Sequence, residues 1–138
     1  MKLKSCLRSF IFLIPLILVF SKSMAEPTFV QSKSLDSNFY LGLNFNNDGT
    51  KMYTVNADNG RGSKDAVIEY ILTTPYDIST AIVNNTKNVS RGGFTEATQV
   101  VFNNDGTKMF IVNHAGRKSV DEYLLSTAFD VSTATFDS

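Results

Sequence analysis

The sequence predicts an all-β protein built from propeller-type blades, each made of four antiparallel strands. Three observations predict this fold class: a long internal repeat, short apolar runs separated by turn residues, and the lack of a sustained helical period between residues 26 and 138. The octet FNNDGTKM occurs twice, at Phe45–Met52 and at Phe102–Met109. Self-similarity at a long fixed period, here about 55 residues, is typical of repeat architectures.

The repeat extends well beyond the octet. FNNDGTKMYTVN matches FNNDGTKMFIVN at ten of twelve positions, with an offset of 57 residues. EYILTTPYDISTA, which begins at Glu69, matches EYLLSTAFDVSTA, which begins at Glu122, at eight of thirteen positions with an offset of 53. The offset changes because residues 58–63 are replaced by a shorter segment at 114–116. Changes in length are typical of surface loops, so we expect a loop there.

Three apolar runs in each unit are rich in β-branched and aromatic residues, and turn-forming residues separate them. This pattern predicts strands at Leu41–Phe45, Lys51–Asn56, Val67–Leu72, Thr98–Phe102, Lys108–Asn113 and Val120–Leu125.

A fourth, outer strand is expected at Ile82–Val89, with a counterpart at Phe29–Leu35 ahead of the first unit. Residues 135–138 align with the beginning of this outer strand. The grouping predicts one blade at about 28–81 and a second at about 82–138. The inner strands are apolar on both faces, as in propellers, where each blade packs between two neighbours.

The octet with the residues that follow it resembles a known repeat signature. The run Phe-Asn-Asn-Asp-Gly-Thr-Lys-Met-(Tyr/Phe), then Val-Asn, resembles the F-x-x-D-G-T-K-x-Y-V-x-N signature of YVTN-type and related exported bacterial β-propellers. The block from Glu69 to Ala81 resembles the second half of blades in a long-repeat subgroup of these proteins. The resemblance covers nearly all of residues 26–138 and implies the propeller fold. It implies little about activity, because propellers host many functions.

Residues 1–25 have the pattern of an export signal. Lys2, Lys4 and Arg8 precede an apolar core at Phe10–Phe20, and small residues before Glu26 provide a cleavage site after Ala25. The apolar core has eleven residues and contains proline, whereas a membrane span needs about 20 apolar residues. We therefore expect a cleaved signal peptide, a secreted or periplasmic protein, and no membrane span in the mature region 26–138.

Removal of the signal changes the charge and the cysteine content. Residues 1–25 hold four Lys/Arg and no acids, which leaves nine basic residues against 13 acidic ones and a formal net charge of −4. This balance argues against a nucleic-acid partner, which requires a basic surface. The only cysteine, Cys6, leaves with the signal, so the mature chain must be stable without disulfides.

The repeated octet is predicted to be a turn between two strands. Asp48-Gly49 and Asp105-Gly106 lie between apolar runs, and Asp-Gly is a strong hairpin signal because tight turns need residues that tolerate positive φ. The alternative is a calcium loop, since Asn44-x-Asn46-x-Asp48-Gly49 resembles the start of an EF-hand. The twelfth position of that loop is a valine, and the second copy replaces Asn44 with valine, so the turn is favoured.

Other repeated polar residues also have structural interpretations. Cross-strand ion pairs are expected between Lys51 and Glu69 and between their counterparts, Lys108 and Glu122, each worth a fraction of a kcal/mol. Asp77 and Asp130, each followed by Ile/Val-Ser-Thr, are expected to cap turns. The functional alternative is that these carboxylates line a channel.

Residues outside the repeat are the better candidates for binding. The weak candidates lie in three loops and are Arg61, Lys64, Arg91, His114 and Arg117. If the blades are standard, the loops at 58–64 and at 114–117 lie on one rim and the segment at 91–96 on the opposite rim. Catalytic and cofactor-binding sites are not predicted. His114 is the only histidine, and neither G-x-S-x-G nor a mature cysteine occurs, so nucleophilic triads and zinc sites lack parts.

The function expected from these observations is that of a binding or interaction scaffold. Propellers close with about four to eight blades, so two blades leave apolar faces uncovered. Exposed patches of that kind predict a protein partner or self-association. The alternatives are a fragment of a propeller enzyme, lactonase-like or quinone-dependent, and a self-assembling surface or structural protein. The two blades could also be the remnant of a degraded gene.

Overall fold

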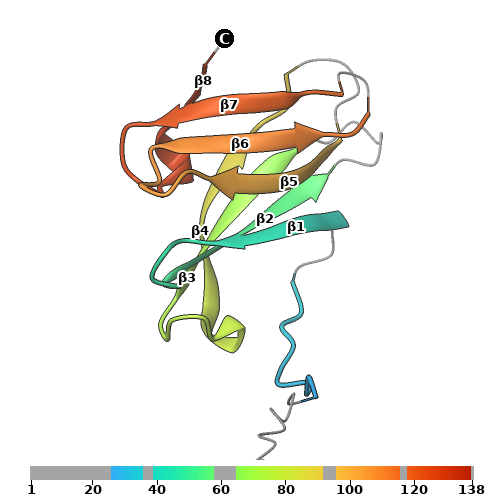
Figure 1. Ribbon diagram of the computed structural model, residues 1–138, viewed down its shortest axis with the longest axis vertical. Helices are drawn as coiled ribbons and strands as arrows, with labels where there is room; N and C mark the ends of the chain where they lie inside the picture. Colours follow the sequence, from blue (N-terminus) through green and yellow to red (C-terminus); the bar gives the residue numbers. More distant parts are fainter. Residues whose placement is uncertain (1–25, 36–38, 58–64, 92–95, 116–117, 138) are drawn as a thin grey trace, which may run out of the picture.

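The computed structural model describes residues 26–35, 39–57, 65–91, 96–115 and 118–137. Within these ranges the protein forms two four-stranded antiparallel sheets, which lie against each other as two propeller-like blades (Figure 1). The predicted all-β fold class is therefore confirmed. Sheet 1 has the order β1 (Phe39–Phe45), β2 (Lys51–Ala57), β3 (Ala66–Leu72) and β4 (Ala81–Asn88). Sheet 2 has the order β5 (Ala97–Phe102), β6 (Lys108–Asn113), β7 (Val120–Leu125) and β8 (Ala134–Phe136).

The six inner strands begin and end within two residues of the bounds predicted from the sequence. The grouping of the outer strands, however, differs from the prediction. The strand expected at Ile82–Val89 is β4, which pairs with β3 and so belongs to the first blade rather than the second. Likewise β8 completes the second blade by pairing with β7. Each blade therefore ends with its outer strand instead of beginning with one.

The strand expected at Phe29–Leu35 is wrong. Residues 26–35 have no regular secondary structure and run alongside the lower part of sheet 1 (Figure 1). Lys33 donates a hydrogen bond to the backbone oxygen of Ser79, and Leu35 packs on the cluster that includes Met52 and Tyr70. The first blade has no need of this segment as a strand, because β4 already occupies the position beside β3.

Alternation along the strands separates two cores. Tyr53 and Val55 point to sheet 2, whereas Met52, the residue before Tyr53 in β2, points to the other side of sheet 1. The core between the sheets is the larger one and contains these buried members: Tyr53, Val55, Val67, Val89, Ala97, Val100, Met109, Ile111, Tyr123, Leu125, Val131 and Ala134. This core is built from one face of each sheet, so its apolar side chains are buried only because the two sheets pack against each other.

Short 3-10 helices connect the last two strands of each sheet. They are η1 (Ile78–Thr80) in sheet 1 and η2 (Val131–Thr133) in sheet 2. The carboxylate of Asp77 accepts a hydrogen bond from the backbone N–H of Ser79, and Asp130 does the same for Ser132. The expected capping role of both aspartates is therefore seen. The segment of η2 packs against β3 and β4 of the neighbouring sheet.

Candidate functional site

The repeated octet forms the turns that join β1 to β2 and β5 to β6. Gly49 and Gly106 both have φ of 71°, a backbone conformation that residues with a Cβ rarely adopt. Asp48 Oδ1 accepts hydrogen bonds from the backbone N–H of Thr50 at 2.9 Å and from its hydroxyl at 2.6 Å. Asp105 has the same two bonds with Thr107. These bonds hold the pKa of each carboxyl below its ordinary value of 3.8, the bond from the threonine hydroxyl contributing most.

The atoms that a calcium ion would need are engaged within the turn. The side-chain oxygen of Asn44 accepts a hydrogen bond from the N–H of Phe45, and that of Asn46 accepts one from the N–H of Lys51. Asp48 is used as described above. Among the described residues there is no group of three histidine, cysteine or acidic side chains that could hold a metal ion. The geometry therefore supports the turn and gives no support to the calcium loop.

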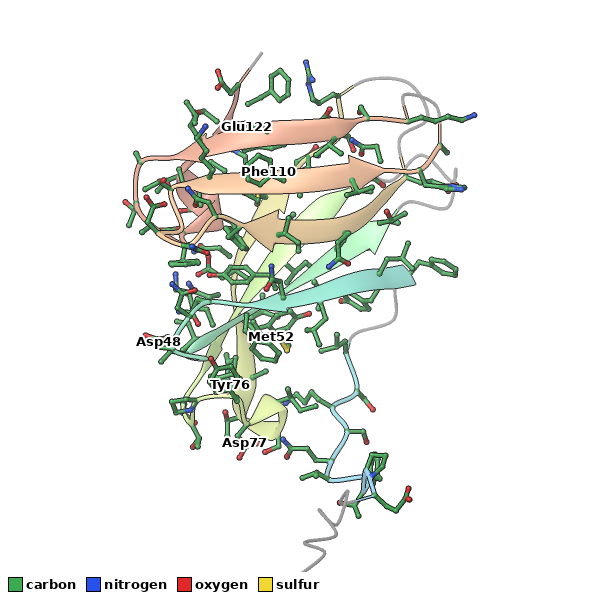
Figure 2. The ribbon with its side chains drawn as sticks, in the orientation of Figure 1. Asp48, Met52, Tyr76, Asp77, Phe110 and Glu122 are labelled. Carbon is green, nitrogen blue, oxygen red and sulfur yellow. The ribbon has the colours of Figure 1, made fainter. Side chains whose placement is uncertain are left out.

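Within each unit, the octet contacts the later repeated block, which begins at Glu69 or Glu122, at these turns. Tyr76, in the connection between β3 and β4, covers Gly49, and a Cβ built on that glycine would collide with the tyrosine ring. Tyr76 also donates its backbone N–H to the carbonyl of Gly49 at 2.9 Å and its hydroxyl to the carbonyl of Asn47 at 3.0 Å. Phe129 covers Gly106 in sheet 2 in the same way. Figure 2 shows Asp48 and Tyr76 close together at one edge of the molecule.

The predicted lysine–glutamate pairs are confirmed in both sheets, with nitrogen–oxygen distances of 3.0 Å for Lys51–Glu69 and 2.6 Å for Lys108–Glu122. Their surroundings differ in a way that the sequence did not reveal. The side chain of Glu69 is 0% exposed, whereas that of Glu122 is 32% exposed. The small energy expected for a surface pair therefore does not apply to Glu69.

Glu69 is the centre of a polar contact between the sheets. Its Oε1 accepts hydrogen bonds from the amide of Asn84 at 2.6 Å and of Asn85 at 3.4 Å. Its Oε2 accepts the backbone N–H of Val131, in sheet 2, at 3.0 Å. A buried carboxylate is stable only when its oxygens are satisfied in this way. The site is therefore a joint in the structure, and it does not leave a carboxylate free to line a channel.

The carbonyl of Phe129 is the second acceptor at this contact. Lys51 Nζ donates to it at 2.9 Å and Tyr53 Oη donates to it at 2.8 Å. Burial, followed by the negative charge of Glu69, raises the pKa of the Tyr53 hydroxyl, so the phenol stays protonated and remains a donor. We name these residues of sheet 1 (Lys51, Tyr53, Glu69) the docking triad, because together they bind the backbone of 129–131.

Of the candidate binding residues outside the repeat, the two that the structure describes, Arg91 and His114, lie at the same end of the sheets. The N–H of His114, after β6, donates to the carbonyl of Glu96, before β5, at 2.9 Å, and His114 Nδ1 lies 3.6 Å from Glu96 Oε2. The backbone carbonyl of Asp65, before β3, accepts the N–H of Val89, after β4. The described flanks of all three loops thus meet at one end, and the expectation that 91–96 lies on the opposite rim is wrong. Antiparallel pairing explains this, because β4 returns to the end where β3 begins.

The individual candidates are placed differently. The side chain of His114 is 77% exposed. Arg91 instead lies over the ring of Phe136, 3.1 Å from its centroid, and its Nη1 lies 3.8 Å from Asp121 Oδ1, so it helps to join β4 to sheet 2. Arg61, Lys64 and Arg117 lie outside the described residues.

Sequence reasoning missed two buried acids at this end of the molecule. Asp65 is almost fully buried, and its Oδ2 accepts the N–H of Ala97 at 3.0 Å, which connects the start of β3 to the start of β5. Asp121 is also buried and accepts a hydrogen bond from the hydroxyl of Ser119. Neither acid is repeated in the other unit. Lys118 is aligned with Asp65, and Ile68 is aligned with Asp121. The sequence did contain a signal for these buried acids, because each one lies in or next to an apolar run and has no acidic counterpart in the other unit.

The part of the chain that the structure describes contains no helix long and apolar enough to span a membrane. In the comparisons with known proteins, no family model, curated protein or solved structure matches this chain.

Proposed function

We propose that this chain is an exported repeat protein, similar to YVTN-type propellers, that acts as a binding scaffold rather than as an enzyme. The observation that carries the proposal is that the repeated polar residues make structural contacts, whereas an unrepeated polar pair is exposed. The repeated ones, such as Asp48, Glu69 and Asp77, are engaged in turns, caps and the contact between sheets. The exposed unrepeated pair of His114 and Glu96 is held by a backbone hydrogen bond, from the N–H of His114 to the carbonyl of Glu96, at the end where the described flanks of three connections meet. Loops positioned by a rigid scaffold in this way commonly carry binding.

Export is tested by fractionating cells that express the full chain. We expect the protein outside the cytoplasm, with a new N-terminus at Glu26 in its mass spectrum. Retention of residues 1–25 in cytoplasmic protein would contradict this part of the proposal.

Binding is tested by screening the purified chain against arrays of soluble glycans and peptides. A ligand bound at the proposed end should lose affinity when His114→Ala or Glu96→Gln is introduced. Asn104→Ala, which lies in the β5–β6 turn at the other end, is the matched control and should bind as the unchanged chain does. Loss of affinity in the control alone would place binding elsewhere, and turnover of an array component would contradict the scaffold function.

A further inference from the structure

The outer face of sheet 2 repeats the face of sheet 1 that is buried between the blades. We name it the open face, and it consists of Val101, Lys108, Phe110, Val112, Val120, Glu122 and Leu124. The register places Phe110 beside Val101 on one strand and beside Glu122 on the other, so the three form a row across the sheet. Figure 2 shows Phe110 and Glu122 on neighbouring strands of this sheet.

Position by position, the open face matches a buried surface. Val67 in sheet 1 is 0% exposed, and its counterpart Val120 is 63% exposed. Val55 is likewise buried completely, whereas Val112 is exposed. The residue types are conserved between these pairs of positions, yet only one of each pair is covered. Burial of exposed valine and leucine against a partner is favourable by about 25 cal/mol for each Å² removed from water.

The contact between the two sheets of one chain shows which kind of segment covers a face of this type. The segment 129–131 binds the docking triad of sheet 1: the carbonyl of Phe129 accepts from Lys51 and Tyr53, and the N–H of Val131 donates to Glu69. The open face presents Lys108 and Glu122 at the positions of Lys51 and Glu69. Phe110 stands at the position of Tyr53, so it can supply the ring but not the hydroxyl.

The matching segment in sheet 1 is residues 76–78. Tyr76 and Phe129 have nearly the same unusual backbone, with φ of 60° and 59°, and each is followed by an aspartate that caps a 3-10 helix. Tyr76 as a whole residue is 55% exposed. The segment 129–131 makes hydrogen bonds to the docking triad through the carbonyl of Phe129 and the N–H of Val131. Within the described part of the chain, the corresponding carbonyl of Tyr76 and N–H of Ile78 make no such hydrogen bonds. Figure 2 places Tyr76 and Asp77 far from Phe110 and Glu122, toward opposite ends of the molecule.

We propose that the open face of one chain binds residues 76–78 of a second copy, in a head-to-tail contact that repeats the internal one. Lys108 Nζ donates to the carbonyl of Tyr76 in the second copy, and Glu122 accepts the N–H of Ile78. The valines and Leu124 of the open face pack under that copy's sheet 1. Because the two surfaces differ, each chain can bind a neighbour at both ends, which closes into a ring when the rotation permits. A ring of about four to eight blades corresponds to about two to four chains.

The first measurement is the mass of the purified chain by light scattering over a range of concentrations. The proposal expects a discrete species of about two to four chains. A chain that stays monomeric and folded at every concentration overturns it.

Two variants block one surface each. Val120→Arg puts a charge in the middle of the open face, and Ile78→Pro removes the N–H that would donate to Glu122. Asp77 has φ of −87° and ψ of 95°, an extended backbone that a following proline tolerates. Each variant alone should be monomeric. The matched controls are Thr86→Arg, a charge on the exposed part of β4, and Ile78→Ala, which keeps the N–H, and both should assemble as the unchanged chain does. Circular dichroism checks that all four are folded.

Mixing the two blocked variants is the decisive step. The Val120→Arg chain keeps residues 76–78 intact, and the Ile78→Pro chain keeps the open face intact, so an equal mixture should form a dimer of one chain of each kind. A mixture that stays monomeric overturns the proposal. A face-to-face dimer of two open faces would instead let Ile78→Pro associate alone, and that result also overturns it.

Discussion

Glu69 Oε2 accepts a hydrogen bond from the backbone N–H of Val131 at 3.0 Å, across 62 residues of chain and between the two sheets. The same carboxylate lies 3.0 Å from Lys51 Nζ. One fully buried side chain therefore connects two strands of its own sheet to the helical turn of the next. The stability of the contact between blades should depend strongly on this residue.

Glu69→Gln should destabilise the protein, and Glu122→Gln should not. The glutamine amide would place a donor among the existing donors of Lys51, Asn84 and Val131, leaving at least one of them unsatisfied. Unsatisfied buried polar groups cost about 1–3 kcal/mol, which lowers the melting temperature by roughly 4–8 °C for each kcal/mol in a domain of this size. Thermal unfolding followed by circular dichroism checks this. Equal small shifts for both variants would show that the burial of Glu69 has no energetic effect.

Tyr53→Phe should cost about 0.5–1.5 kcal/mol, the usual net value of one hydrogen bond. It removes only the hydroxyl that donates to the carbonyl of Phe129, and the carbonyl keeps the bond from Lys51. The second repeat makes the same replacement naturally, with Phe110 at this position. Urea denaturation of the variant measures the loss. A loss as large as that of Tyr53→Ala would mean that the hydroxyl does more than this bond.

Gly49→Ala should be destabilising by at least about 1 kcal/mol, the cost of a left-handed backbone in a residue with a Cβ. The ring of Tyr76 occupies the space that the new methyl group would need, so the loss should exceed the backbone term alone. A double-mutant cycle with Tyr76→Ala separates the two contributions. The methyl group should cost less in the Tyr76→Ala background, and strict additivity would exclude the clash as a cause.

Acid should destabilise the turns. The threonine hydrogen bonds lower the pKa of Asp48 and Asp105 below 3.8 in the folded protein, so the unfolded chain binds more protons in that range. The stabilisation is fully present above the ordinary pKa and is lost as the pH falls through the lowered value. The melting temperature should therefore fall between about pH 5 and about pH 2.

The double variant Asp48→Asn/Asp105→Asn serves as the control for this pH dependence. It should be less stable than the unchanged chain near neutral pH, and its melting temperature should vary less with acid. An unchanged pH profile in the double variant would assign the acid sensitivity to other carboxylates, such as Asp77, whose pKa is lowered in the same way by bonds from Ser79.

The repeat made much of this fold predictable. A copied turn such as Asp48-Gly49 has a local signal, because the hairpin and the left-handed glycine are determined by residues next to each other in the chain. The inner strands have an equally local signal in their composition, so their bounds were predicted closely. The place of Ile82 in the first blade was not predicted, because pairing with β3 or with the next blade depends on contacts between distant residues that alternation does not report.

The sequence by itself determined the all-β class, the two repeated units, the turns at Gly49 and Gly106, and the presence of a lysine and a glutamate on neighbouring strands. Only the tertiary structure decided that Glu69 is buried while Glu122 remains partly exposed. The two glutamates have nearly the same local sequence, so no local property distinguishes them. Burial depends on which surface packs against which, and sheet 2 covers sheet 1 while no described segment covers sheet 2 in the same way.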